Sequence, residues 1–341
     1  MNQRTIRFSR RSVLQATVAS AATVALSPLC SFAAEPAGAN KNLLFLTKSA
    51  GYQHSVIARN PADPTALAHA EKILSDLAAR QGYAVTATKD ADVFNDPATY
   101  ARYDAFLFYT SGILTQPSDK FLEPRGPDKK PLLGPDGKPV KKLIHTEKPM
   151  SNEGKALFLK AVEEGKGFMG FHASSDSFHS RTTELLRAAD AKEEVDPYIQ
   201  MLGGEFTGHG SQQKSALRVA STTFPGLEDL KGYEMHEEWY GLKNLAPDMH
   251  VLLVQDTTTM RADPATGKRE KDYDRPPYPM TWARAHGKGR VFYTSMGHRE
   301  DVWTNEVFQK ILLASLAWIT RRTNGDLPPN LDKVCPHLVA K

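Results

Sequence analysis

The run GKGFMGFHASSD (165–176) carries two chemically active side chains, His172 and Asp176, directly after a short apolar strand bounded by glycines. In open parallel α/β sheets, ligands bind outside the carboxyl ends of strands, and a side chain on the strand-to-helix turn is both rigid and accessible. An imidazole at such a position can act as a base, an acid or a metal ligand. The alternative is that His172 only hydrogen-bonds a neighbouring loop.

Further polar groups follow segments that we expect to end at loops. His54 lies in GYQHS (51–55), and His209 lies between glycines in GGEFTGHG (203–210), where the backbone can approach a ligand closely. Glu238 belongs to the acidic and aromatic run YEMHEEWY (233–240), and His298 ends the run GKGRVFYTSMGH (287–298). Histidines and acids therefore gather at predicted strand ends.

The elements that must position these groups alternate between strand and helix. Apolar runs predict strands over 42–47, 83–87, 104–109 and 168–171, and the continuous runs are typical of strands buried on both faces. Helical spacing predicts helices over 66–80, 152–164 and 307–319. This alternation implies parallel strands with right-handed crossovers, in one α/β domain.

A segment rich in Pro, Gly and Lys, at about 116–150, interrupts this pattern, and its GPDG run (134–137) predicts a hairpin turn. We interpret the segment as a surface insertion beside the site. Its eight basic and five acidic residues are typical of a solvated flap rather than a binding patch. The alternative is a flap that closes over a pocket.

The N-terminus predicts export. SRRSVLQ (9–15) matches the twin-arginine signal, and an apolar stretch and a small-residue cleavage site follow it. We expect a signal peptide at 1–34, the α/β domain at 35–325, a C-terminal tail at 326–341 and a periplasmic or secreted location. No later apolar stretch is long enough to span a bilayer, so no membrane partner is expected after the signal is removed.

Charge and cysteine content exclude several classes of function. Residues 1–34 hold four arginines and no acid, which leaves 39 basic and 39 acidic side chains in the rest of the chain. A formally neutral domain gives no reason to expect nucleic acid as a partner. Outside the predicted signal the only cysteine is Cys335, so neither an internal disulfide nor a cysteine nucleophile is expected.

Five segments, taken in order, resemble the ThuA-like, or trehalose-utilisation, family over about 42–319. They are the His54-Ser55 loop, GFHASSDSF, GGEFTGH, the acidic pair before Trp239-Tyr240, and GKGRVFYTSMGH. The resemblance implies a flavodoxin-like parallel sheet with helices on both faces, as in class I glutamine amidotransferases, and a link to disaccharide use. His172 matches the position where those amidotransferases carry their nucleophilic cysteine. Because glutamine hydrolysis through a thioester needs that thiolate, amidotransfer is excluded.

Sugar-active enzymes use either two carboxylates or, for a sugar oxidised to a ketone, a base and a Lewis acid. The second option fits better, since histidines outnumber paired carboxylates here. The resemblance suggests 3-keto-disaccharides, made by a companion sugar oxidoreductase, as substrates. A base could then start β-elimination or isomerisation while a divalent metal stabilises the enolate, which makes the protein a lyase, hydrolase or isomerase.

Site roles follow from this chemistry. His172 and His209 are expected to hold the metal, Glu238 to act as a base or third ligand, and Asp176 to orient a histidine. The remaining residues are expected to bind the carbohydrate, two at the mouth of the pocket and two as stacking faces: His54, His298, Tyr240 and Trp282. For Trp282 the alternative of a core position is the more common one for large aromatic residues. No nucleotide cofactor is expected.

Two other classes of protein remain as alternatives. A non-catalytic periplasmic carbohydrate-binding protein would need the same pocket without a reactive base or acid. A structural or partner-binding module would show no concave polar cluster. The polar groups at predicted strand ends argue more strongly against the second alternative than against the first.

Overall fold

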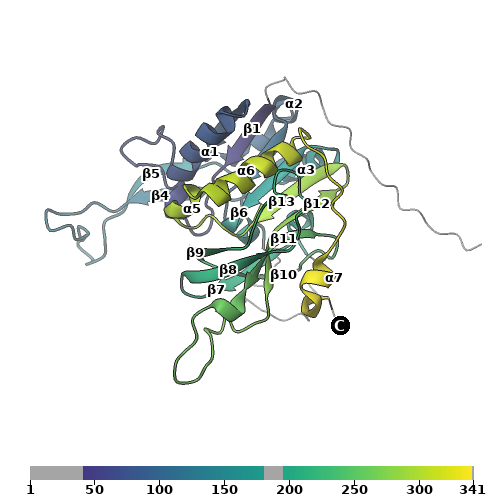
Figure 1. The fold of residues 1–341 in the computed structure, drawn as a ribbon. Helices are drawn as coiled ribbons and strands as arrows, with labels where there is room; N and C mark the ends of the chain where they lie inside the picture. Colours follow the sequence, from purple (N-terminus) through teal and green to yellow (C-terminus); the bar gives the residue numbers. More distant parts are fainter. Residues whose placement is uncertain (1–40, 180–194, 340–341) are drawn as a thin grey trace, which may run out of the picture. The chain divides into compact units, whose positions relative to one another are not determined.

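The computed structural model describes residues 41–179 and 195–339, whose elements all lie in one compact unit spanning 33–341. Its centre is a nine-stranded sheet in the order β2-β1-β3-β6-β13-β12-β11-β8-β9 (Figure 1). The strands are β1 (Lys41–Leu46), β2 (Tyr83–Thr88), β3 (Ala105–Phe108), β6 (Gly167–Phe171), β8 (Gln213–Val219), β9 (Tyr233–Glu237), β11 (His250–Asp256), β12 (Tyr278–His286) and β13 (Gly289–Thr294). The predicted α/β class is confirmed.

The sheet has a parallel half and an antiparallel half. Strands β2, β1, β3, β6 and β13 pair in parallel, as the alternation of strands and helices predicts. Strands β12, β11, β8 and β9 extend the sheet in antiparallel fashion, which the sequence analysis did not predict. The hairpin between β12 and β13 turns at Gly287, where φ is 58° and a Cβ would lie 2.6 Å from the Glu163 carbonyl oxygen. Glycine avoids both penalties.

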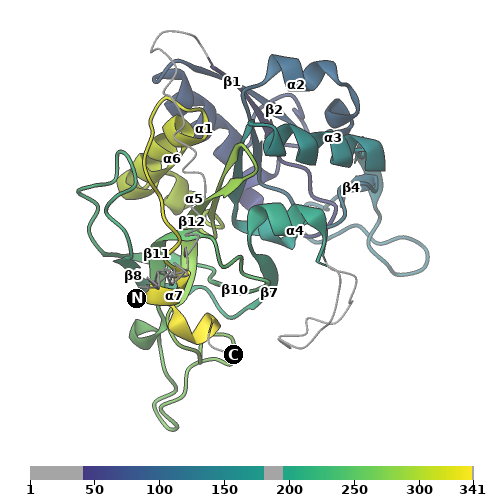
Figure 2. The same ribbon diagram turned by 90° about the vertical axis from the view of Figure 1, so that its right-hand side faces the viewer.

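Helices cover both faces of the sheet, as predicted (Figures 1 and 2). One face packs against α1 (His69–Ala79), α5 (Glu300–Trp303) and α6 (Glu306–Ile319), and the other against α3 (Asn152–Glu163) and α4 (Pro197–Leu202). Short α2 (Ala98–Arg102) lies near α3. Successive side chains of β1 alternate between the two cores, Leu43 and Phe45 on one face and Leu44 and Leu46 on the other. Two-sided burial explains why this strand is a continuous apolar run.

Two small sheets complete the fold. β7 (Glu205–His209) pairs with β10 (Tyr240–Lys243), and β4 (Ser118–Leu122) pairs with β5 (Lys142–Glu147), both in antiparallel fashion. The chain between β4 and β5 forms an extended arm (Figure 1). Within the arm, the Gly137 amide donates to the Gly134 carbonyl at 3.0 Å, so the predicted GPDG turn is present.

The C-terminal segment is part of the packed domain. It contains α7 (Leu331–Val334), and Leu331 and Cys335 are buried in the core. The side chain of Asn330 hydrogen-bonds both the amide and the carbonyl of Val251 on β11. Burial raises the pKa of the Cys335 thiol to about 11, so this cysteine is a poor nucleophile. Residues 326–339 are therefore better described as a docked segment than as a tail.

The predicted signal peptide, including Cys30, lies outside the described residues. Among the residues that are described, none of the helices is long and apolar enough to cross a membrane.

Candidate functional site

Four side chains meet beyond the carboxyl ends of strands of the large sheet. They come from the loops after β1, β6, β9 and β13, and their potential ligand atoms all lie within 4.8 Å of one another. We call the four residues the histidine–glutamate cluster: His54, His172, Glu238 and His298. All are buried or nearly buried, and His298 is the most exposed of the four.

His172 occupies a strained turn. It follows β6 as the first residue of the 3-10 helix η3 (His172–Asp176), and its φ of 37° is rare for a residue other than glycine. Such strain costs about 1–3 kcal/mol and is concentrated at functional sites. The imidazole is fully buried under the ring of Tyr240, whose centroid lies 4.0 Å away. The turn therefore holds one reactive side chain in one orientation.

Hydrogen bonds set the tautomer of His172. Its Nδ1 lies 2.7 Å from the Ser295 carbonyl oxygen, which can only accept, so Nδ1 carries the proton. The lone pair of Nε2 then faces the rest of the cluster, 3.5 Å from Glu238 Oε2 and 3.3 Å from His298 Nδ1. Burial lowers the pKa of His172 and favours the neutral ring. A neutral imidazole with one nitrogen anchored on a carbonyl is the usual state of a metal-binding histidine.

Glu238 is the anionic centre of the cluster. His298 Nδ1 lies 3.1 Å from its Oε2. Burial opposes ionisation, but the neighbouring imidazoles of His172 and His298 outweigh that effect and hold the pKa of Glu238 well below its usual range. For His298 burial also acts against the charged form, yet Glu238 raises the pKa of His298 above its usual value. The carboxylate thus stays charged beside the imidazoles.

His54 is the unsatisfied member of the cluster. Only 4 % of the residue is exposed, and its Nδ1 is buried without a hydrogen-bond partner among the described residues. Its ring meets those of His172 and His298 edge-on, at centroid distances of 4.8 and 5.0 Å. Burial, reinforced by the two neighbouring histidines, lowers the pKa of His54 to about 2. Since buried polar atoms are rarely left unpaired, this neutral nitrogen fits the role of a ligand to a cation.

The cluster as a whole has the donor set of a transition-metal site. Three imidazoles and one carboxylate are typical ligands of Zn²⁺ and of related divalent ions. The orphaned Nδ1 of His54 and the anchored ring of His172 both fit such an ion. These four residues could therefore hold a divalent metal.

A buried glutamate that received no role from the sequence positions two members of the cluster. Glu237 Oε2 accepts hydrogen bonds from the amides of Gly297 (2.7 Å) and His298 (3.1 Å), and its Oε1 accepts one from the amide of Glu238 (2.8 Å). Gly297 has a φ of 119°, which favours glycine. Burial raises the pKa of Glu237 to about 7 in spite of these three donors. Adjacent residues of a strand point to opposite sides, so two neighbouring acids at a strand end can have different surroundings. The acidic pair was therefore the feature of the sequence that could have indicated a separate role for Glu237.

The structure separates the expected metal pair of His172 and His209. His172 is in the cluster, but His209 lies at its outer edge, where its side chain is 43 % exposed and Nδ1 is 3.4 Å from Glu238 Oε1. His54 and His298, which we expected at the mouth of the pocket, supply the other two imidazoles. The sequence analysis predicted no strand pairing for the second half of the chain. It therefore could not decide which of these histidines are buried in the site and which lie at its edge.

The expected stacking faces are also wrong. Tyr240 is only 3 % exposed and packs against His172, so it supports the cluster from behind. Trp282 is fully buried, and its Nε1 donates to the Leu202 carbonyl oxygen at 2.9 Å. The aromatic side chain that is open to solvent beside the cluster is Tyr52, which is 69 % exposed and lies edge-on to His54 at 4.9 Å.

Asp176 orients a histidine, as expected, but the histidine is His179 and not a member of the cluster. His179 Nε2 hydrogen-bonds Asp176, and its Nδ1 lies 3.2 Å from Glu205 Oε1. Burial alone would lower the pKa of His179, but the two carboxylates outweigh burial and raise that pKa to about 9. Asp176 therefore belongs to an ion-pair group beside the cluster.

This ion-pair group predicts a pH dependence of stability. The folded pKa of His179 is raised above its unfolded value of 6.5, so its contribution is fully present below pH 6.5 and is lost as the pH rises through about 9. We expect His179→Gln to lower the free energy of unfolding more at pH 6 than at pH 10, measured by urea denaturation. His145→Gln, at a histidine on β5 that is 44 % exposed, is the control for the loss of a histidine side chain outside this group. An equal loss at both pH values would contradict the prediction.

The Glu237 hydrogen bonds predict a second effect. Glu237→Gln keeps the shape of the side chain but turns an amide NH₂ toward at least one backbone N–H donor. At pH 8 we expect a loss of about 1–3 kcal/mol in the free energy of unfolding, the cost of leaving a buried donor unsatisfied. Glu234→Gln, on the exposed side of the same strand, should change it by less than about 0.5 kcal/mol. Equal stability of the two variants would show that Glu237 does not hold these loops.

Comparison with known proteins identifies the family to which this fold belongs. A family model described as ThuA, trehalose utilisation, matches residues 139–319, and no match is found among curated proteins. A solved ThuA-like protein from Bacteroides uniformis ATCC 8492 aligns with a TM-score of 0.56 at 16 % identity over 84 % of this chain and 94 % of that chain. A ThuA-like protein from Parabacteroides merdae ATCC 43184 aligns with a TM-score of 0.50 at 15 % identity over 83 % and 90 % of the two chains. The structures share the fold, and the family model covers more than half of the sequence, so the chain belongs to the ThuA (trehalose utilisation) family.

Proposed function

We propose that this protein is a metal-dependent enzyme of carbohydrate metabolism that acts as a lyase, hydrolase or isomerase on a disaccharide or its 3-keto derivative. One observation carries the proposal: three imidazoles and a carboxylate meet within 4.8 Å, and one of the imidazole nitrogens is buried without a partner. Membership of a family linked to trehalose utilisation supports a carbohydrate as the substrate. The twin-arginine motif supports action in the periplasm or outside the cell.

A divalent ion in the cluster would polarise a substrate oxygen and stabilise negative charge that develops on it. The protein's own contribution is to keep the His54 and His172 imidazoles neutral and to hold the cluster in a fixed orientation. Ser295 fixes His172 through Nδ1, and Glu237 fixes the loops that carry Glu238 and His298. Since these supports are buried, the cluster keeps its shape before a substrate arrives.

His209 is placed to move a proton. Its Nδ1 contacts the Gly210 carbonyl at 3.0 Å and Glu238 at 3.4 Å, and these acceptors keep the proton on that nitrogen. Nε2 then has a free lone pair on an exposed ring and can accept a proton from a bound sugar. A ketone acidifies the adjacent C–H, so this transfer would start elimination or isomerisation. In this proposal a companion sugar oxidoreductase supplies the ketone.

The proposed metal centre is tested by metal content. We expect the protein, dialysed against Zn²⁺ and then against metal-free buffer, to retain close to one ion per chain in elemental analysis. His298→Ala and Glu238→Gln each remove one ligand and should weaken metal binding by more than the roughly 10- to 100-fold typical of losing an outer-shell partner. His145→Ala removes an exposed histidine outside the cluster and should bind the ion unchanged. Equal metal binding by the unaltered protein and the three variants would contradict the assignment of His298 and Glu238 as metal ligands.

The proposed reaction is tested by turnover of 3-keto-disaccharides. We expect product formation by the metal-loaded protein, loss of turnover after chelation and recovery when the ion is returned. His209→Ala should lower kcat by about 10²- to 10⁴-fold, the usual contribution of a general base, while the metal content stays unchanged. Turnover that survives chelation would favour metal-free acid-base chemistry. Saturable binding without turnover across these sugars would favour a carbohydrate-binding protein instead.

A further inference from the structure

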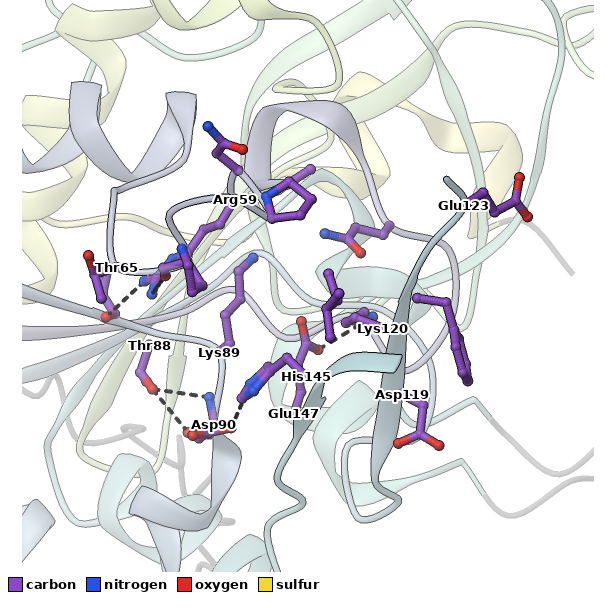
Figure 3. Close-up of a pocket in the computed structure, with 18 of the residues that line it drawn as sticks. Arg59, Thr65, Thr88, Lys89, Asp90, Asp119, Lys120, Glu123, His145 and Glu147 are labelled. Atoms are coloured by element: carbon purple, nitrogen blue, oxygen red, sulfur yellow. Dashed lines mark hydrogen bonds and ion pairs between the residues drawn. The ribbon is translucent and has the colours of Figure 1, made fainter. Parts of the chain in front are cut away.

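A cleft of about 880 Å³ lies between the loops that follow β1 and β2 and the base of the β4–β5 arm (Figure 3). Its volume is in the range of sites for small organic ligands. Gln53 lines the cleft, whereas the next residue, His54, belongs to the histidine–glutamate cluster. The backbone at His54 is extended, so the two side chains leave the loop in opposite directions. The cleft is thus separate from the cluster, and none of the four cluster residues lines it.

The charged side chains in the walls of the cleft are paired. Arg59 and Lys89 share the fully buried carboxylate of Glu71, and Lys89 also donates to the Thr47 carbonyl at 2.8 Å. The lysine and arginine side chains that line the cleft all have acidic partners among the described residues. The pairs are Arg59–Glu71 at 2.8 Å, Lys89–Glu71 at 3.8 Å, Lys120–Glu147 at 3.5 Å and Lys141–Glu123 at 3.6 Å.

This pairing indicates the charge of the ligand. A phosphate or carboxylate would have to compete with acids that already hold every lysine and arginine of the walls, and a cation would meet the same lysines and arginines. An uncharged ligand that donates and accepts hydrogen bonds avoids both costs. Gln53, Asn60 and Thr65 add neutral polar groups to the lining.

The cleft also offers apolar faces. Phe121 on β4 is 50 % exposed and Ile144 on β5 is 40 % exposed, and both line the cleft. Pro61 and Pro64 also line it, from the loop after β1. Polar groups combined with an exposed aromatic ring suit a ligand that has both hydroxyl edges and C–H faces.

We propose that this cleft is a second binding site that takes a neutral, polyhydroxylated molecule of disaccharide or trisaccharide size, with Phe121 as its stacking face. The site goes beyond the proposed reaction, because it uses none of the residues that would hold the ion or move the proton. It therefore binds its ligand whether or not the cluster holds a metal.

The test is isothermal titration of the chelated protein with trehalose, sucrose and maltotriose, and with trehalose 6-phosphate as the anionic counterpart. We expect saturable binding of at least one neutral sugar. The phosphate group of trehalose 6-phosphate should not increase the affinity. Phe121→Ala should weaken that binding by about tenfold or more, whereas Phe121→Tyr, which keeps the aromatic face, should retain it. Phe121 is half exposed, so neither variant should disturb folding.

Two controls separate this site from the cluster. Leu133→Ala alters an arm residue that is 63 % exposed and does not line the cleft, and His298→Ala alters the cluster; both should bind the sugar unchanged. Loss of binding in His298→Ala but not in Phe121→Ala would place the sugar at the cluster and overturn the proposal. Tighter binding of trehalose 6-phosphate, or no binding of any of the three neutral sugars, would overturn it as well. Failure of the metal assay would leave this result unaffected, since the titration uses chelated protein.

Discussion

Parallel pairing of β1, β3, β6 and β13 forces the carboxyl ends of these strands to one edge of the sheet, and the histidine–glutamate cluster depends on that constraint. His54, His172 and His298 each follow a strand of this set, separated by more than a hundred residues in sequence. A chain in which these strands alternated in direction would send the three imidazoles to opposite edges. The antiparallel half of the sheet then adds Glu238 at the end of β9.

Burial gives the cluster its chemical character. Burial alone favours neutral imidazoles, and it lowers the pKa of both His54 and His172. The single carboxylate, Glu238, keeps its charge because the imidazoles of His172 and His298 lie beside it. A second buried carboxyl, Glu237, faces backbone amides and so serves as a positioning residue. Two adjacent glutamates thus have different tasks because their side chains leave the strand end in different directions.

The loop after β1 links the two regions to which we assign ligands. One of its residues, His54, enters the cluster, and the residue before it lines the cleft against the β4–β5 arm. The insertion expected as a solvated flap therefore contributes a wall, through Phe121, Lys120 and Ile144. Lys120 and Glu147 form an ion pair where the arm leaves the domain, and the Ser49 amide donates to the Glu147 carboxylate there at 2.9 Å. Three ion pairs lie within the insertion, Lys120–Glu147, Lys130–Asp128 and Lys141–Glu123.

The sequence by itself determined the parallel half of the fold, because its buried strands are continuous apolar runs and its helices have a clear apolar spacing. It also identified His172, His54, Glu238 and His298 as candidate site residues, because histidines and acids gather where predicted segments end in loops. Only the tertiary structure decided which of them meet, because depth in a site depends on packing between segments that are distant in sequence. The exposed Tyr52 and the buried Trp282 illustrate the same limit. In the sequence an exposed aromatic residue cannot be told from a buried one, because only the neighbours that cover it decide whether its face is open to a ligand.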